Sequence, residues 1–250
     1  MILPRILETK AREVAEACAP RASLEEALRK PGLGVIGEIK RASPSRGAFA
    51  PHADPAAQLH LYEEGGAAAV SVVTDRTFFH GDPETLRALR PRTSLPLLRK
   101  DFLIHPLQVY ESRLLGADAV LLLACALDQR SLRELLDLAR SLGMEALVEV
   151  HDEEELRRVL DTSARVLGVN NRDLRDFSVD LTTTRRLAEA LDRLGGKDRV
   201  LVSESGVRSP EDAEKLARWG ADGILVGEAL MTDPDPTELL RRLRAAGGTP

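Results

Sequence analysis

The sequence has 250 residues, which is enough for one α/β barrel with a large buried core. Hydrophobic residues make up 43% and charged residues 30% of the chain, which excludes an intrinsically disordered or membrane-embedded protein. The net charge is −5 and aromatic residues make up only 3%. The basic tracts and stacking side chains that nucleic-acid binding requires are therefore missing from the sequence. We expect a globular protein that binds neither nucleic acid nor membrane.

Cysteine content and the start of the chain indicate the cellular compartment. The two cysteines, Cys18 and Cys125, form neither a metal-ligand cluster nor a disulfide framework, and we expect both to fill small spaces in the core. The chain opens with a charged helical segment rather than a signal peptide. The sequence contains no apolar run close to the ~20 residues needed to cross a bilayer. These features predict a cytoplasmic protein.

The first ~30 residues predict helices that precede the first strand, as the segments ILETKAREVAEAC and ASLEEALRK indicate. We expect these helices to cover the body of the protein or to contribute to the mouth of its site. Nothing in the sequence resembles an interdomain linker. We therefore expect one domain over residues 1–250, with a helical extension over 1–32 and the main body over 33–250.

Short apolar, β-branched segments recur along the rest of the chain and predict eight strands. Runs this apolar are typical of parallel strands that are buried on both faces. The predicted strands span residues 33–40, 67–74, 95–100, 119–124, 145–150, 164–171, 199–205 and 223–230.

Amphipathic segments between these strands predict helices. Examples are PAAQLHLYEEGG, QVYESRLLGA, SLRELLDLARSLG and PEDAEKLARWGA, several of which end in glycine, as helix C-caps often do. Eight β/α units in a chain of this length predict an α/β fold of the (β/α)₈ TIM-barrel type. An open Rossmann-like sheet is the alternative, but the first strand is not followed by a G-x-G-x-x-G motif. We therefore favour the closed barrel.

Polar residues at the carboxyl ends of the strands are the candidates for a functional site, because active sites of such barrels lie at that end. Glu38 and Lys40 are two residues apart and so point to the same side of their strand. A single polar strand end is also explained by contact with solvent. Because five of the eight predicted strand ends carry Lys, Glu or Asn, a convergent polar pocket is the better explanation.

Several strand-end motifs resemble those of indole-3-glycerol-phosphate synthases. They are GEIKRASPSRG, LLRKDFL, LVEVH, GVNNRDL and SESG, with further agreement in SVVTDRTFFHGD and ILVGEALM. They occur in the family order with barrel-compatible spacing, and the resemblance covers nearly the whole chain. It implies a carboxy-lyase of tryptophan biosynthesis. The implied reaction closes the ring of 1-(2-carboxyphenylamino)-1-deoxyribulose 5-phosphate and releases CO₂ and water to give indole-3-glycerol phosphate.

The resemblance also implies roles for the strand-end residues. Ring closure onto a ketone needs an acid at the carbonyl oxygen, and a base must later remove a proton to restore the aromatic ring. By the resemblance, Lys100 is the general acid and Glu149 the general base. Lys40 is the substrate-binding lysine and would pair with an anionic group such as the anthranilate carboxylate. The remaining catalytic candidates are Glu38 and Glu204, which would hold the lysines and substrate hydroxyls, and Asn170, which would donate hydrogen bonds.

A phosphate site is expected in the loops after the seventh and eighth strands, as in many barrels of this type. Their glycines would let backbone N–H groups approach the phosphate, although turn formation alone also explains glycines there. Glu228 stands where the family pattern often has serine, and we expect its carboxylate to turn away from the phosphate. The candidate phosphate-binding residues are Ser205, Gly206, Gly227 and Glu228, with Ser43 and Arg172 as helpers.

Three apolar residues, Phe79, Phe102 and Leu122, are candidates for a wall against the anthranilate ring. Ordinary core packing explains them equally well. We expect His151 to be structural or exposed and Asp101 to cap the loop that follows it.

Two other functions fit a phosphate-binding barrel. A phosphoribosylanthranilate isomerase would carry a cysteine at the end of the first strand, which this sequence lacks. A catalytically inactive barrel that senses or scaffolds a phosphorylated metabolite is disfavoured, because both Lys100 and Glu149 are present. We expect a phosphorylated small molecule as the binding partner, neither a metal nor another cofactor, and a monomer or weak homo-oligomer.

Overall fold

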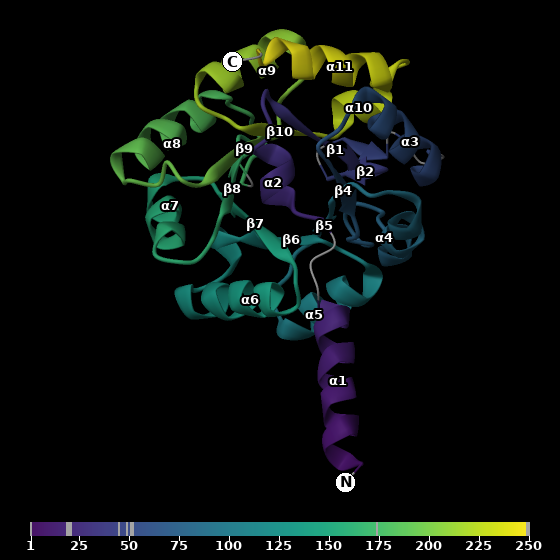
Figure 1. The fold of residues 1–250 in the computed structure, drawn as a ribbon. Helices are drawn as coiled ribbons and strands as arrows, with labels where there is room; N and C mark the ends of the chain where they lie inside the picture. The colour runs from purple at the N-terminus through teal and green to yellow at the C-terminus, as the bar shows by residue number, and fades with distance from the viewer. Residues whose placement is uncertain are drawn as a thin grey trace.

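Eight parallel strands form a closed barrel in the computed structural model, which describes residues 2–18, 22–44, 46–48, 50, 53–173 and 175–248. Each strand pairs with its neighbours in chain order, and the last strand pairs with the first (Figure 1). This arrangement confirms the predicted (β/α)₈ barrel. The strands are β1 (Gly34–Ile39), β4 (Ala69–Val73), β5 (Leu97–Lys100), β6 (Ala119–Leu123), β7 (Glu145–Val150), β8 (Val166–Asn170), β9 (Val200–Glu204) and β10 (Gly223–Val226).

Helices surround the barrel, and a small hairpin follows the first strand. The hairpin pairs β2 (Ala42–Ser43) with β3 (Gly47–Ala48). Two 3₁₀ turns, η1 (Arg90–Arg92) and η2 (Ala124–Ala126), lie between helices and strands. The surrounding helices are α3 (Pro55–Gly65), α4 (Pro83–Leu89), α5 (Pro106–Leu115), α6 (Gln129–Ser141), α7 (Glu153–Leu160), α8 (Thr182–Arg193), α9 (Pro210–Arg218), α10 (Glu228–Thr232) and α11 (Pro236–Ala246).

Local sequence signals fix most of these helix ends. Asp54 caps α3 by accepting a hydrogen bond from the backbone N–H of Ala56, and Pro55 occupies the first turn. The same pairing of a capping side chain with a following proline begins α4, α9 and α11. Gly66 ends α3 in the left-handed conformation, with φ of 81°. A glycine is favoured there because a Cβ atom strains this backbone geometry.

The apolar residues form two layers. Alternate strand residues point outward and pack under the helices, whereas the others fill the inside of the barrel. The inner layer contains Ile36, Ala69, Leu98, Ala119, Leu121, Leu123, Leu147, Val166, Val200, Val202 and Leu225. The outer layer contains the residues between them, such as Val35, Leu97 and Val148.

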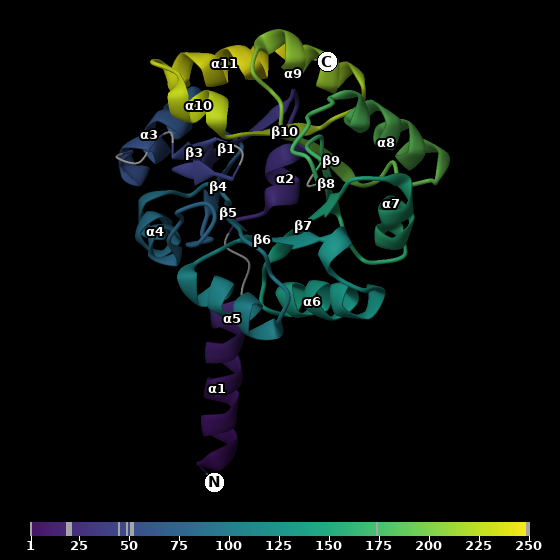
Figure 2. The same ribbon diagram turned by 180° about the vertical axis from the view of Figure 1, so that it is seen from behind.

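The second N-terminal helix, α2 (Leu24–Leu28), closes the amino end of the barrel (Figure 1 and Figure 2). Leu24 and Leu28 are fully buried and belong to the inner layer. Leu28 fills space beside Gly34 and Gly223, where an added Cβ atom would lie 2.7 and 2.8 Å from its Cδ2 atom. The helix thus covers the barrel, as expected, but at the end opposite the mouth.

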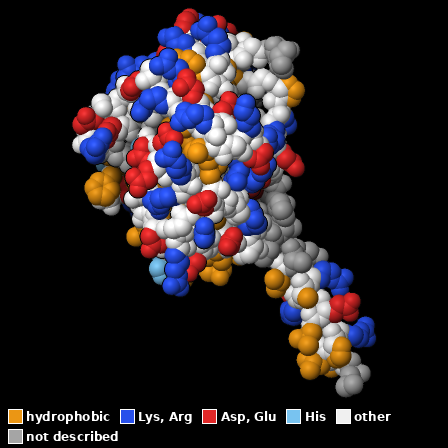
Figure 3. Space-filling view, turned by 90° about the vertical axis from the view of Figure 1, so that its left-hand side faces the viewer, with side chains coloured by type: hydrophobic (Ala, Val, Ile, Leu, Met, Phe, Trp, Pro, Cys, Tyr) orange, Lys and Arg blue, Asp and Glu red, His pale blue; other side chains and the backbone are white. Residues whose placement is uncertain are grey.

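The first N-terminal helix, α1 (Leu3–Cys18), extends away from the barrel (Figure 1). Its described apolar side chains include Leu3, Ile6, Leu7 and Val14, and all four are exposed. Figure 3 shows hydrophobic side chains along this projecting helix. Among the described residues, no helix combines the length and the apolar character needed to cross a membrane.

Strand boundaries differ from the prediction mainly at the last strand. The apolar run 223–230 predicts one strand, but β10 ends at Val226 and α10 begins at Glu228. A helix buries one apolar stripe much as a strand buries one face, so apolar residues alone do not separate the two. Gly227 breaks the run and is the N-cap of the helix.

Candidate active site

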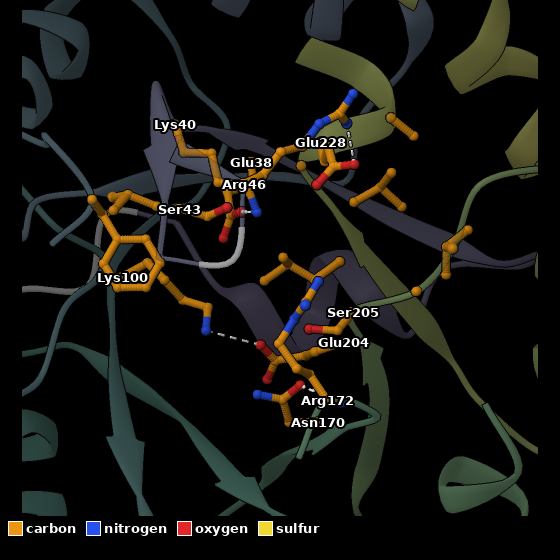
Figure 4. A pocket seen from close by; sticks show the side chains of 18 of the residues that line it. Glu38, Lys40, Ser43, Arg46, Lys100, Asn170, Arg172, Glu204, Ser205 and Glu228 are labelled. Atoms are coloured by element: carbon orange, nitrogen blue, oxygen red, sulfur yellow. Dashed lines mark hydrogen bonds and ion pairs between the residues drawn. The ribbon is translucent and has the colours of Figure 1, made fainter. Parts of the chain in front are cut away.

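The carboxyl ends of the strands surround a cavity of about 830 Å³. This is the end of the barrel at which active sites of the fold lie. Figure 4 shows charged and polar side chains from several strands gathered in the cavity. The side chains predicted as catalytic all line it: Glu38, Lys40, Lys100, Glu149, Asn170 and Glu204.

The alternation of side chains along each strand directs the ionisable groups inward. Leu98 of the inner layer precedes Lys100 by two residues on β5, and Leu147 has the same relation to Glu149 on β7. Residues two apart on a strand face the same way. The pattern that sends apolar side chains into the barrel therefore also brings the charged ones to its mouth.

Lys100 lies between two carboxylates. Its Nζ atom is 3.2 Å from Oε2 of Glu149 and 3.1 Å from Oε2 of Glu204. Burial alone would lower the pKa of Lys100, but the negative charges of Glu204, Glu149 and Glu38 outweigh burial and raise it. The ammonium group therefore stays protonated over the whole range of neutral pH.

The two carboxylates differ in their protonation. Burial would raise the pKa of Glu149, but the Lys100 charge and a 3.0 Å hydrogen bond from Nδ2 of Asn170 hold it below its usual value. Burial raises the pKa of Glu204 to about 7 against the lowering effect of Lys100. Both Glu204 oxygens are buried, and Oε2 contacts Nζ of Lys100. Glu149 is therefore ionised at neutral pH, whereas Glu204 exchanges a proton near neutrality.

A second ion pair lies above the first strand. Nζ of Lys40 is 2.6 Å from Oε1 of Glu38, and both side chains are largely buried. Gly227 makes room for this pair, because a Cβ atom there would collide with the Glu38 carboxylate and lie 2.9 Å from Nζ of Lys40. A larger residue at this position would displace the Glu38–Lys40 ion pair.

The loops after β9 and β10 line the cavity. Ser205 and Gly206 both have positive φ angles, of 65° and 91°. The Nδ2 atom of Asn171, which is buried, holds this turn by donating to the carbonyl oxygens of Glu204 and Ser205. Ser205, Gly206, Gly227 and Glu228 all line the cavity, as the sequence predicts.

The carboxylate of Glu228 is paired with the guanidinium group of Arg46 (Figure 4). Arg46 lies in the loop after β1, so the pair links that loop to the start of α10. The negative charge of Glu228 is thereby compensated at the edge of the cavity.

Comparison with known proteins gives one consistent result. Residues 4–243 match the family model described as indole-3-glycerol phosphate synthase. Proteins named indole-3-glycerol phosphate synthase from Petrotoga mobilis and Parafrankia sp. are 46% and 52% identical to this chain. The first alignment covers 94% of both chains, and the second covers 92% of this chain and 84% of the relative.

The chain belongs to the indole-3-glycerol phosphate synthase family. This membership confirms the resemblance found in the strand-end motifs and the expected class, a carboxy-lyase of tryptophan biosynthesis. A thiamine phosphate pyrophosphorylase from Pyrococcus furiosus has a similar structure, with a TM-score of 0.63 over 90% of this chain and 98% of its own. At 19% sequence identity, this likeness supports the fold alone.

Two of the three apolar candidates lie at the cavity of this family member. Phe79 and Phe102 line it, with ring centroids 6.1 Å apart. The prediction for Leu122 is wrong, because this residue belongs to the outer layer and its neighbours Leu121 and Leu123 line the cavity instead. Every residue of this strand is apolar, so the sequence does not reveal which alternate set faces inward.

Further cavity residues come from loops. The predicted helpers Ser43 and Arg172 line the cavity, and the backbone N–H of Arg172 donates to Oδ1 of Asn170. Sequence reasoning missed Phe177 and Val179, which line the cavity from the segment between β8 and α8. Loop residues show no periodicity that would reveal their direction.

The polar side-chain atoms of Cys125, His151 and Glu155 lie within 4.8 Å of one another. Nδ1 of His151 is 3.3 Å from Oε2 of Glu155. The prediction that Cys125 fills the core is wrong, because it is exposed on η2. The side chain of Cys18 lies outside the described residues. Asp101 accepts a hydrogen bond from the backbone N–H of Phe102, in agreement with its expected capping role.

Proposed function

We propose that the cavity binds 1-(2-carboxyphenylamino)-1-deoxyribulose 5-phosphate and closes its ring to give indole-3-glycerol phosphate. The observation that carries this proposal is the arrangement of Lys100 between Glu149 and Glu204 inside the cavity. A buried cation beside an ionised carboxylate provides both the acid and the base that the reaction needs, and Glu204, with a pKa of about 7, can gain or lose a proton beside them.

Lys100 acts as the general acid. The attack of the aryl carbon on the ketone places negative charge on the carbonyl oxygen, and the ammonium group donates a proton to it. The same oxygen later leaves as water when Lys100, reprotonated from solvent, donates a second proton to it. The raised pKa of Lys100 keeps its proton available at neutral pH.

Glu149 acts as the general base. Loss of CO₂ from the condensed intermediate and removal of a ring proton restore the aromatic system, and the ionised carboxylate accepts that proton. Its lowered pKa keeps it ionised while Asn170 fixes its position. Oε2 of Glu204 pairs with Lys100, whereas Oε1 is buried and has no hydrogen-bond donor among the described residues, which suits contact with a substrate hydroxyl.

Lys40 binds the anthranilate carboxylate, and Glu38 holds it. The 2.6 Å ion pair fixes the ammonium group at the mouth of the cavity before substrate binds. Phe79 and Phe102 contact the aromatic ring of the substrate, with Leu121 in place of Leu122.

The phosphate binds at the loops after β9 and β10. Ser205, Gly206, Gly227 and Glu228 line the cavity together, and their backbone N–H groups would donate to the phosphate, with Ser43 and Arg172 as further cavity-lining donors. We further propose that the enzyme acts in the cytoplasm as a monomer or weak homo-oligomer, without a metal or other cofactor.

A matched pair of variants on one strand tests this function. Glu149 and Glu145 lie at opposite ends of β7, and Glu145 accepts hydrogen bonds from Ser23 and the backbone N–H of Glu25 at the closed end. The wild type should form indole-3-glycerol phosphate in the presence of EDTA, and absorbance and fluorescence measure this product. Glu149→Gln should lower kcat by ~10²-fold or more, whereas Glu145→Gln should retain it. Full activity of Glu149→Gln would contradict the proposal, and loss of activity in EDTA would contradict its cofactor-free part.

A further inference from the structure

One imidazole lies between the proposed base and a second carboxylate. His151 follows β7, and its Nε2 atom is 3.4 Å from Oε1 of Glu149. On the other side, its Nδ1 atom is 3.3 Å from Oε2 of Glu155 on α7. The backbone N–H of His151 donates to the same Glu155 oxygen over 2.8 Å. Glu155 therefore holds both the ring and the backbone of His151.

The surroundings of His151 favour its charged form. Its side chain is only 19% exposed, and Nε2 is buried without a hydrogen-bond partner among the described residues. The contact with Glu149 is thus a charge interaction rather than a hydrogen bond. Burial would lower the pKa of His151, but Cys125, Glu155 and Glu149 outweigh it and raise the value to about 10.

The two oxygens of Glu149 have different partners. Oε1 accepts the hydrogen bond from Asn170 and faces His151, whereas Oε2 is 3.2 Å from Nζ of Lys100. A protonated imidazole has no lone pair with which to take up the proton that Glu149 removes from the substrate. Its contribution is therefore to hold the carboxylate rather than to relay a proton.

We propose that His151, held by Glu155, is a positioning residue that keeps Oε1 of Glu149 turned away from the substrate, so that Oε2 faces Lys100 and the reacting ring. This inference rests on the proposed role of Glu149 as the base. It assigns a function to a residue that the sequence suggests is only structural or exposed.

The charges around this group set the expected pH dependence. Glu149 faces Lys100, Glu204 and His151. Besides Glu149 and Glu155, His151 faces Cys125 and interacts with the charge of Asp173. Because His151 is a cation beside Glu149, its removal should raise the pKa of Glu149. The base is then ionised only at higher pH.

Single-turnover ring closure by His151→Leu tests the inference, since product release does not obscure that rate. At pH 7 the rate should fall about tenfold, with KM changed by less than about twofold. The acid limb of the pH–rate profile should move to higher pH by about one unit. His60→Leu is the matched control, because His60 is exposed and pairs with Glu64 on the outer helix α3. It should behave as wild type.

A charge-retaining variant separates positioning from packing. His151→Lys should return the acid limb toward its wild-type position, because it restores a positive charge. The rate should recover only in part, because the contacts of the imidazole ring with Glu149 and Glu155 are lost. A His151→Leu enzyme with wild-type rate and an unmoved acid limb would overturn the inference. If His151→Leu does not fold, Glu155→Gln decides the question. It removes the carboxylate that holds the ring and backbone of His151, so the single-turnover rate at pH 7 should fall, by less than in His151→Leu, and a wild-type rate would overturn the inference.

Failure of the positioning role of His151 can be distinguished from failure of the proposed function. If Glu149→Gln retains full activity, the base is wrongly assigned and the proposed function fails. If Glu149→Gln is inactive while His151→Leu has the wild-type rate and pH profile, only the positioning role fails.

Discussion

At the amino end of the barrel, Leu24 and Leu28 fill the space between the strands, whereas at the carboxyl end the same inner layer carries Lys100 and Glu149. One end is closed by a helix and packed with apolar side chains. The other end opens into a cavity of about 830 Å³ and buries ionisable groups beside one another.

The comparison shows that the closed end of the barrel contributes mainly to stability and the open end to catalysis. Burial of apolar area stabilises the closed end, while removing a lysine and two glutamates from water costs free energy at the open end. Such an arrangement is typical of sites whose groups act on a substrate. Changes at the two ends should therefore have separate effects on stability and on activity.

The largest effect on stability is expected at the closed end. Leu28→Ala removes a fully buried side chain that contacts both Gly34 and Gly223, and should lower the free energy of unfolding by about 2–5 kcal/mol. Urea titration measures this change. Leu114→Ala, an exposed position on α5, is the control and should have little effect. Below the melting temperature, kcat/KM should match wild type in both variants. A large fall in kcat/KM for folded Leu28→Ala would show that the two ends are not independent.

At the open end, a carboxylate placed at the phosphate loops should weaken binding. Gly206→Asp should raise KM about tenfold or more, because its charge repels the dianion and its Cβ atom would lie 2.5 Å from Cγ1 of the cavity-lining Val179. Gly195→Asp is the matched control, since Gly195 has a similar positive φ of 78° but lies in open space after α8. Steady-state kinetics with inorganic phosphate as competitor measure both. Equal KM values in the two variants, together with no inhibition by phosphate, would place the phosphate elsewhere.

A smaller effect concerns pH. Glu204 has a pKa of about 7 in the folded protein against an ordinary value of 4.5. Between these values the unfolded chain ionises this group first, so its contribution to stability is present at low pH and is lost as pH rises toward 7. Glu204→Gln should remove this part of the decline, measured by urea unfolding at several pH values. Glu189→Gln on the exposed side of α8 should not. An identical slope in wild type and Glu204→Gln would contradict the raised pKa.

The smallest effect is expected from α1. Its described side chains up to Val14 are exposed, whereas α2 contributes Leu24 and Leu28 to the core. Deletion of residues 1–18 should change the melting temperature and KM little, and deletion of residues 1–30 should lower the melting temperature clearly. Calorimetry of both truncations measures this. A large loss on removing residues 1–18 alone would give α1 a packing role that its exposure does not suggest.

Much of this comparison could be predicted from the sequence. The eight apolar runs and their glycine-ended helices are periodic signals, and the barrel follows from their number. The strand-end positions of Lys100, Glu149 and Glu204 follow from the same periodicity, because residues at the ends of parallel strands meet at one edge.

Other features depend on contacts that one-dimensional patterns do not contain. All residues of β6 are apolar, so the sequence alone does not show that Leu121 rather than Leu122 points into the cavity. The lowered pKa of Glu149 and the raised pKa of Glu204 depend on spatial contacts, among them the hydrogen bond that Asn170 donates to Glu149. The exposure of Cys125 and the two carboxylates around His151 arise from neighbouring elements, namely η2, β7 and α7.

The most direct test of the central claim compares the two lysines of the open end. Lys100 is proposed to deliver a proton and Lys40 to bind the substrate carboxylate, so the same loss of charge should give different kinetics. Lys100→Ala should lower kcat by ~10²-fold or more with a modest change in KM, whereas Lys40→Ala should act chiefly on KM. Steady-state measurement of kcat and KM for both variants at pH 7 distinguishes these outcomes. Near-wild-type kcat in Lys100→Ala together with loss of kcat in Lys40→Ala would contradict the account.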